Sequence, residues 1–103
     1  MKVKAINVQA KSWFDEENGN SYFSAKVTIN SGTKSAKVIP LHFQYGYGDH
    51  YLDIAKRKLV EKGIIDTGDR VSLYSYCYEN DIPFSYSKEE NCTEEEAKQF
   101  TGE

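Results

Sequence analysis

The chain has 103 residues, of which 39% are hydrophobic and 28% charged, and its net charge is −3. A chain of this length forms one domain that folds without metals or disulfides, and this composition excludes a disordered protein. It has no apolar run of the roughly 18 residues that a membrane-spanning helix needs and no secretory signal, so we expect a cytoplasmic protein without a membrane partner.

Three strands are predicted in the first part of the chain. Residues 2–10 form the first, and a slip in the phase of their apolar positions indicates a bulge. A loop over 15–20 leads into residues 21–30, where apolar and polar side chains alternate cleanly. The third strand spans 34–43, with Pro40 favouring an edge position. These strands are expected to form an antiparallel meander.

A helix and a fourth strand are predicted next. Asp49 is a good N-cap, residues 50–62 carry apolar side chains at helical spacing, and Gly63 suits the end of the helix. Residues 70–78 alternate between aliphatic and aromatic side chains, which predicts a strand. The fold class is therefore α+β, with an antiparallel sheet of about four strands in the order β-β-β-α-β and one main helix packed on one face.

The end of the chain differs in charge from the rest. Residues 1–78 carry eleven Lys and Arg against eight Asp and Glu, whereas residues 79–103 carry two Lys against eight acidic residues. We therefore predict a single domain over 1–82 and an acidic C-terminal segment over 83–103. A capping box, Thr93 with the glutamate three residues later, predicts a short helix over 94–100 within that segment.

Tyrosine is over-represented, with eight Tyr residues in a chain that is 14% aromatic. On a strand over 70–78, Tyr74, Tyr76 and Tyr78 would lie on one face, joined by Tyr22 from a neighbouring strand. Exposed tyrosines anchor protein partners or stack on nucleic-acid bases, although the C-terminal segment could equally cover this face.

The stretch Tyr45-Gly46-Tyr47-Gly48-Asp49 precedes the predicted helix. Two glycines before a helix can cradle an anion, but the lysine and hydroxyl of a phosphate-binding loop are absent, and an aspartate stands where a phosphate would lie. We interpret the stretch as a turn between strand and helix whose tyrosines, Tyr45 and Tyr47, pack inward or contact a partner.

The sequence offers only weak candidates for metal-binding or catalytic residues. His42, Asp49, His50 and Asp53 lack the spacing of a metal or acid–base site, and His50 and Asp53 can pair with each other on the first helical turn. Cys77 and Cys92 have no CxxC spacing, and a thiol on the apolar side of a strand is usually inert; we expect the former to be a buried hydrophobe and the latter a tail thiol. We predict no enzyme, no metal and no cofactor.

Three segments carry a resemblance: residues 11–15 (KSWFD), 18–25 (NGNSYFSA) and 43–49 (FQYGYGD). Over roughly residues 3–65 the chain resembles a group of small uncharacterised proteins encoded by bacteriophages and prophages. The group has no established activity, so the resemblance assigns no functional residue. It implies a viral protein acting in the cytoplasm of a host cell, where small accessory phage proteins often inhibit defence machinery, as anti-restriction and anti-CRISPR proteins do.

The leading hypothesis is therefore a non-enzymatic phage-type accessory protein that binds and inhibits a host or phage protein. The tyrosines named above would be its contact residues. The alternative is a small module that binds single-stranded nucleic acid by tyrosine stacking and cationic side chains, namely Lys26, Lys37, Lys56, Arg57 and Lys58. A homodimer formed by pairing of edge strands remains open.

Overall fold

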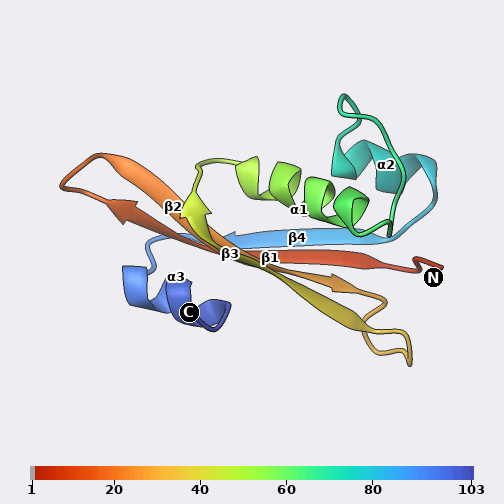
Figure 1. The fold of residues 1–103 in the computed structure, drawn as a ribbon, viewed down its shortest axis with the longest axis horizontal. Helices are drawn as coiled ribbons and strands as arrows, with labels where there is room; N and C mark the ends of the chain where they lie inside the picture. Colours follow the sequence, from red (N-terminus) through yellow and green to blue (C-terminus); the bar gives the residue numbers. More distant parts are fainter. Residues whose placement is uncertain (1) are drawn as a thin grey trace.

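The computed structural model describes residues 2–103 and has four strands and three helices. In chain order these are β1 (Ile6–Asp15), β2 (Asn20–Ile29), β3 (Lys37–Tyr45), α1 (His50–Glu61), α2 (Leu73–Glu79), β4 (Phe84–Glu89) and α3 (Glu94–Phe100). Figure 1 shows one twisted sheet with α1 and α2 on one side and α3 on the other. The predicted α+β class and the predicted number of strands are confirmed, whereas the fourth strand lies elsewhere in the chain and there are more helices than predicted.

The sheet is mixed, with the strand order β3-β2-β1-β4. Strands β1, β2 and β3 form the predicted antiparallel meander, whereas β4 pairs in parallel with β1. The prediction of a purely antiparallel sheet was wrong, because the chain crosses one face of the sheet through α1 and α2 before it reaches the edge beside β1. The C-terminal segment thus supplies the fourth strand as well as α3.

The hydrophobic core lies between the sheet and α1. Alternate side chains of β1 and β2 point into it, and Ala55 and Leu59 of α1 are fully buried against them. Asp49 precedes α1 and Gly63, with a φ of 71°, follows it, as predicted. The apolar side chains of the strands with at most 2% of their surface exposed are Ile6, Val8, Phe23, Ala25, Val27, Ile29 and Ile39.

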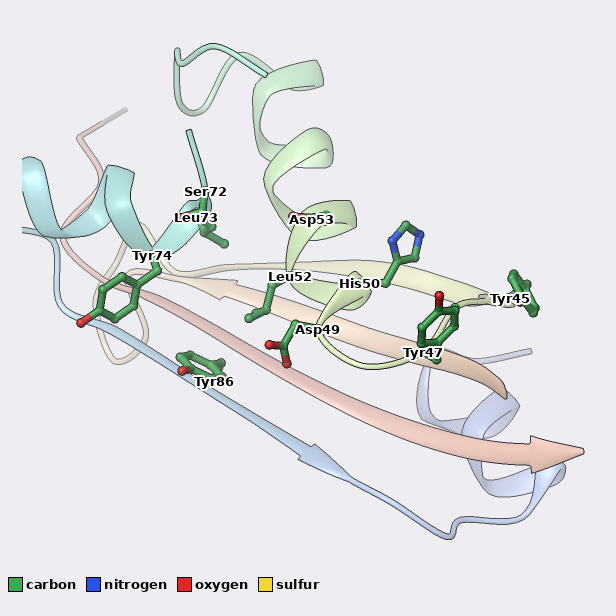
Figure 2. Close-up of a pocket in the computed structure, with 11 residues that line it drawn as sticks. Tyr45, Tyr47, Asp49, His50, Leu52, Asp53, Ser72, Leu73, Tyr74 and Tyr86 are labelled. Atoms are coloured by element: carbon green, nitrogen blue, oxygen red, sulfur yellow. The ribbon is translucent and has the colours of Figure 1, made fainter. Parts of the chain in front are cut away.

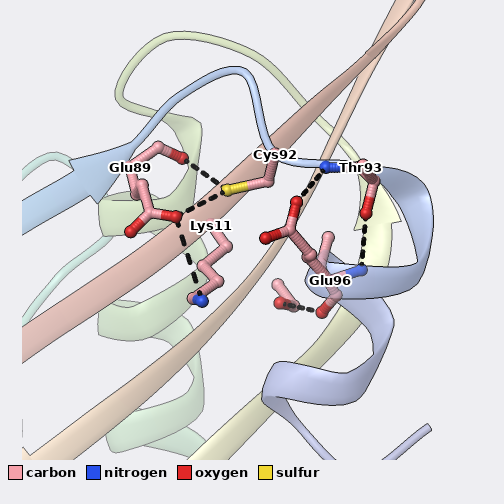
Figure 3. A network of polar contacts seen from close by, with 7 residues as sticks. Lys11, Glu89, Cys92, Thr93 and Glu96 are labelled. Carbon is pink, nitrogen blue, oxygen red and sulfur yellow. Dashed lines mark hydrogen bonds and ion pairs between the residues drawn. The ribbon is translucent and has the colours of Figure 1, made fainter.

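The opposite face of the sheet is covered in part by α3. The capping box is present as predicted: Thr93 Oγ1 accepts a hydrogen bond from the Glu96 amide, and the Glu96 carboxylate accepts one from the Thr93 amide (Figure 3). The buried Ser24 hydroxyl of β2 donates to the Ala97 carbonyl. The ammonium groups of Lys11 from β1 and Lys26 from β2 lie over the Phe100 ring. This helix is therefore held largely by polar contacts.

The fourth predicted strand, residues 70–78, was wrong, because Leu73–Glu79 forms α2. Leu73 and Cys77 are both buried, and a separation of four residues puts them on the same side of a helix as well as of a strand. The Ser72 side chain favours the helix over the strand, because its hydroxyl accepts a hydrogen bond from the Ser75 amide and caps the helix.

The bulge predicted in the first strand was also wrong. The strand begins at Ile6, and each of its residues pairs one for one with a residue of β2. Val3 and Ala5, which caused the slip in phase, lie before it. The irregularity in register lies instead between β2 and β3, at Phe23 and Ala25.

Over residues 2–103, no helix has the length and apolar character needed to cross a bilayer.

Candidate functional site

A groove opens at the start of α1, where three stretches of the chain meet, namely residues 45–53, residues 72–74 and Tyr86. It has a volume of about 660 Å³, and its walls come from the loop after β3, the first turn of α1, the start of α2 and the middle of β4. Figure 2 shows Asp49, just before α1, and Leu52, in its first turn, pointing towards the side of the groove where Tyr74 and Tyr86 lie. The groove residues are Tyr45, Gly46, Tyr47, Asp49, His50, Leu52, Asp53, Ser72, Leu73, Tyr74 and Tyr86.

Gly46 sets the shape of the loop after β3. A Cβ atom built on it would lie 2.7 Å from the Phe23 ring and from the His50 ring, which is closer than real Cβ atoms approach. The absence of a side chain therefore lets the backbone lie flat against the core, and the Gly46 amide donates to the Ser21 carbonyl. Tyr45 and Tyr47, on either side, are 56% and 71% exposed. The loop thus presents two rings to solvent on a rigid support.

The three tyrosines of α2 have different environments. Tyr74 is exposed and lines the groove, and Tyr78 is exposed but does not line it. Tyr76 is partly buried against the core. The predicted stripe of three rings on one strand face does not exist, because a helix turns successive side chains by about 100°. Of the three, only Tyr74 joins Tyr45 and Tyr47.

Tyr86 is a groove residue that the sequence interpretation missed. It lies on β4, and 49% of its surface is exposed. On the same face of β4, the Phe84 ring lies next to it, with 5.3 Å between the ring centroids. The alternation of aromatic and serine residues in Phe84-Ser85-Tyr86-Ser87 was the available signal for a strand, but the acidic residues that follow obscured it.

The groove carries negative charge. Asp49 and Asp53 are exposed carboxylates on its α1 side. Their neighbour Tyr51 is buried, and its pKa is raised above the usual value by burial, then by the Asp49 carboxylate and by Tyr86. The phenol of Tyr51 therefore stays neutral at pH 7. The groove combines acidic groups with half-exposed aromatic rings.

Tyr22 lies on the other face of the sheet, away from the groove. Its ring stacks between Trp13 and Phe43, with centroids 5.5 Å and 5.3 Å away. The Tyr45 ring meets its edge at 5.9 Å. These rings belong to neighbouring strands and pack on one another. Their faces are therefore largely occupied by other rings of the same chain.

The structure does not gather the cations proposed for nucleic-acid binding. Lys56 is buried, and its ammonium donates to the Gly68 carbonyl. The Lys26 ammonium lies 4.4 Å from the centroid of Phe100, on the α3 face. Arg57 and Lys58 lie on the far side of α1 beside β3, and Lys37 lies at the start of that edge strand. These residues do not form one basic surface with the groove tyrosines.

The two histidines lie apart. His42 is 3.6 Å from the Glu103 carboxylate at the end of the chain, and His50 lines the groove with its ring against Phe23. Within residues 2–103, no three side chains of the His, Cys, Asp or Glu types are placed to hold a metal ion. Neither histidine pairs with a thiol. Of the candidates for chemistry, Asp49, His50 and Asp53 line the groove, whereas His42 lies outside it.

Both thiols are buried. Burial raises the pKa of Cys77 to about 11, so it is a neutral thiol in the core. Cys92 is buried between β4 and α3, where it donates to the Glu89 carbonyl and carboxylate. Its pKa is raised by burial and by Glu89. It is part of the packing rather than a free tail thiol.

No family model, curated protein or solved structure matches this chain.

Proposed function

We propose that this chain is a non-enzymatic binding protein, of the accessory type that phages encode, which inhibits a host protein by covering part of its surface. The resemblance to small phage proteins implies a host defence protein as the target, as for anti-restriction and anti-CRISPR proteins. The contact surface is the groove at the start of α1. Its tyrosine walls replace the strand face that the sequence had suggested.

The observation that carries this proposal is that four exposed tyrosines line one groove, of which Tyr45 also meets the edge of the Tyr22 ring. Tyr45, Tyr47, Tyr74 and Tyr86 are between 49% and 71% exposed, and they come from three separate parts of the chain. Tyrosine supplies a large contact area at a small cost in conformational entropy and is enriched among the residues that dominate binding energy. Concave, largely apolar surfaces with a few polar groups are typical binding sites.

The test is affinity capture with tagged protein from a nuclease-treated bacterial lysate, followed by direct binding to the purified captured protein. We expect wild type to retain a specific protein. The Tyr47→Ala/Tyr74→Ala double variant should raise the Kd by at least about tenfold, because two anchor rings are removed. Tyr78→Ala is the matched control, since it removes an exposed ring from the same helix outside the groove.

Two results would overturn the proposal. One is that wild type retains no specific protein; the other is that the double variant binds as tightly as wild type and Tyr78→Ala. The nucleic-acid alternative predicts that wild type retains a single-stranded oligonucleotide at low salt and releases it as salt rises, and that Lys26→Ala weakens this retention. That result would count for the alternative and against the proposal.

A further inference from the structure

The groove holds aromatic rings and carboxylates that have no cation. Three rings outside the groove have lysine ammonium groups over them: Lys11 and Lys26 lie over Phe100, Lys98 over Phe43 and Lys88 over Tyr51. Over the described residues 2–103, no lysine or arginine lies over any of the four groove tyrosines. Nor does the side chain of Asp49 or Asp53 take part in a hydrogen bond or ion pair in that part of the chain.

The local charge favours a cation over an anion. The N-terminus of α1 contributes the equivalent of about half a positive charge. The two aspartates carry two negative charges, so they outweigh the helix terminus. The Lys88 ammonium bonds the carbonyl of Gly48, the residue before Asp49, at 3.0 Å and lies 3.3 Å from Glu90, so its charge is already compensated.

We propose that the groove is the socket for an arginine side chain presented by the protein partner. This deepens the proposed function and rests on it. A guanidinium stacks with its flat face on an aromatic ring and offers its edge to a carboxylate. Tyr74 and Tyr86 supply the rings, and Asp49 points towards them from the turn before α1 (Figure 2). Asp53 supplies the second negative charge.

Arginine fits the groove better than lysine does. The ammonium of lysine is a compact, strongly hydrated point charge, which loses its water reluctantly. The groove is open and walled by rings on two sides, so a planar, weakly hydrated cation can lie between them. A negatively charged ligand would face both aspartates without a compensating cation.

The test uses a short capped peptide with one arginine between glycines, and the same peptide with citrulline, which is planar and of nearly the same shape but neutral. Both are titrated into isotopically labelled protein, and amide and ring resonances are followed by NMR. We expect the arginine peptide to shift the resonances of Tyr47, Tyr74 and Tyr86. The citrulline peptide should bind about fivefold or more weakly, because it lacks the charge.

Asp49→Asn should weaken binding of the arginine peptide by about fivefold and leave α1 intact, because the Asp49 side chain makes no capping hydrogen bond. Glu79→Gln is the matched control, since it neutralises an exposed carboxylate at the end of α2, outside the groove. Three results would overturn the inference. They are equal binding of the two peptides, equal binding by Asp49→Asn and wild type, and shifts at the acidic hollow beside Trp13 and Glu94 in place of the groove.

The same variants separate this inference from the function on which it rests. If Tyr47→Ala/Tyr74→Ala loses the captured partner and Asp49→Asn/Asp53→Asn keeps it, the groove binds a partner but not through an arginine. If neither double variant changes capture, the proposed function itself fails. If both variants lose the partner and the circular dichroism spectra match that of wild type, both proposals stand.

Discussion

The two faces of the sheet are covered in different ways. On one, α1 lies over an aliphatic core in which Val8, Val27 and Leu59 have no exposed surface. On the other, the α3 segment is attached by the Ser24 hydroxyl bonded to Ala97, by the Phe43 amide bonded to Glu103 and by lysines over aromatic rings. Apolar burial contributes far more free energy per residue than exposed polar contacts do. We therefore expect the α1 face to carry global stability and α3 to open on its own.

This difference bears on the candidate site. The groove is built on the α1 face, where its Tyr-Gly-Tyr loop packs on Phe23 and its α1 residues extend from a buried helix. A contact surface on a rigid support binds with a smaller loss of entropy. The α3 face, where a helix of seven residues is held largely by polar contacts, is better suited to local motion. The following predictions test that division.

The largest expected effect is on the α1 face. Leu59→Ala removes a side chain with no exposed surface and leaves a cavity between α1 and the sheet. We expect the free energy of unfolding to fall by about 2–5 kcal/mol. Urea denaturation followed by circular dichroism measures it. A loss below that of the α3 variant described next would show that the core does not depend on α1.

A smaller effect is expected on the α3 face. Thr93→Ala removes the hydroxyl that caps α3 and should cost about 1 kcal/mol. Opening of α3 exposes the adjacent Cys92, so its alkylation should accelerate about fivefold. Cys77, in the α1 core, is exposed only by global unfolding and should be alkylated far more slowly than Cys92 in both proteins.

Thr93→Ser is the control for this variant, because serine keeps the capping hydroxyl and should alkylate at the wild-type rate. Equal alkylation rates of the two cysteines would contradict the division, since they would mean that α3 opens only when the whole protein unfolds.

The smallest effect is the pH dependence of α3. The Phe43 amide lowers the pKa of Glu103, and the Thr93 amide lowers that of Glu96, each from 4.5. A carboxyl whose pKa is lower in the folded state stabilises that state above its unfolded pKa, and the stabilisation is lost as pH falls through the folded value. We therefore expect the attachment of α3 to weaken below about pH 4.5.

The amide resonances of Phe43 and Thr93 report this weakening in an NMR titration. Glu103→Gln should abolish the response at Phe43, which bonds that carboxylate, and leave the response at Thr93. Amide shifts that stay constant from about pH 6 to about pH 3 would show that these carboxylates do not hold the segment.

Most of the fold could be predicted from periodicity. The alternation in β2 and the helical spacing in α1 are long and regular, and both elements lie within a residue of the expected ranges. The short helix α2 could not be resolved in this way, because Leu73 and Cys77 satisfy the strand and helix periods alike and tyrosine favours strands. The parallel pairing of β4 depends on a crossover, which no local pattern encodes.

The candidate site was only partly predictable for the same reason. Tyr45, Tyr47 and Tyr74 were singled out as contact residues, and the structure brings them to one groove. Tyr22 joins a ring stack on the other face, and Tyr86 was missed. Which rings meet depends on tertiary arrangement, above all on the pairing of β4 with β1.

That pairing also sets the order in which the molecule can be completed. The central strand β1 precedes the other strands, yet one of its two neighbours, β4, follows only after α1 and α2, with Ile6 paired to Phe84. Such distant pairing slows folding. During synthesis one edge of β1 is therefore unpaired until β4 and its Tyr86 follow, so the candidate contact surface is completed after the meander of β1, β2 and β3.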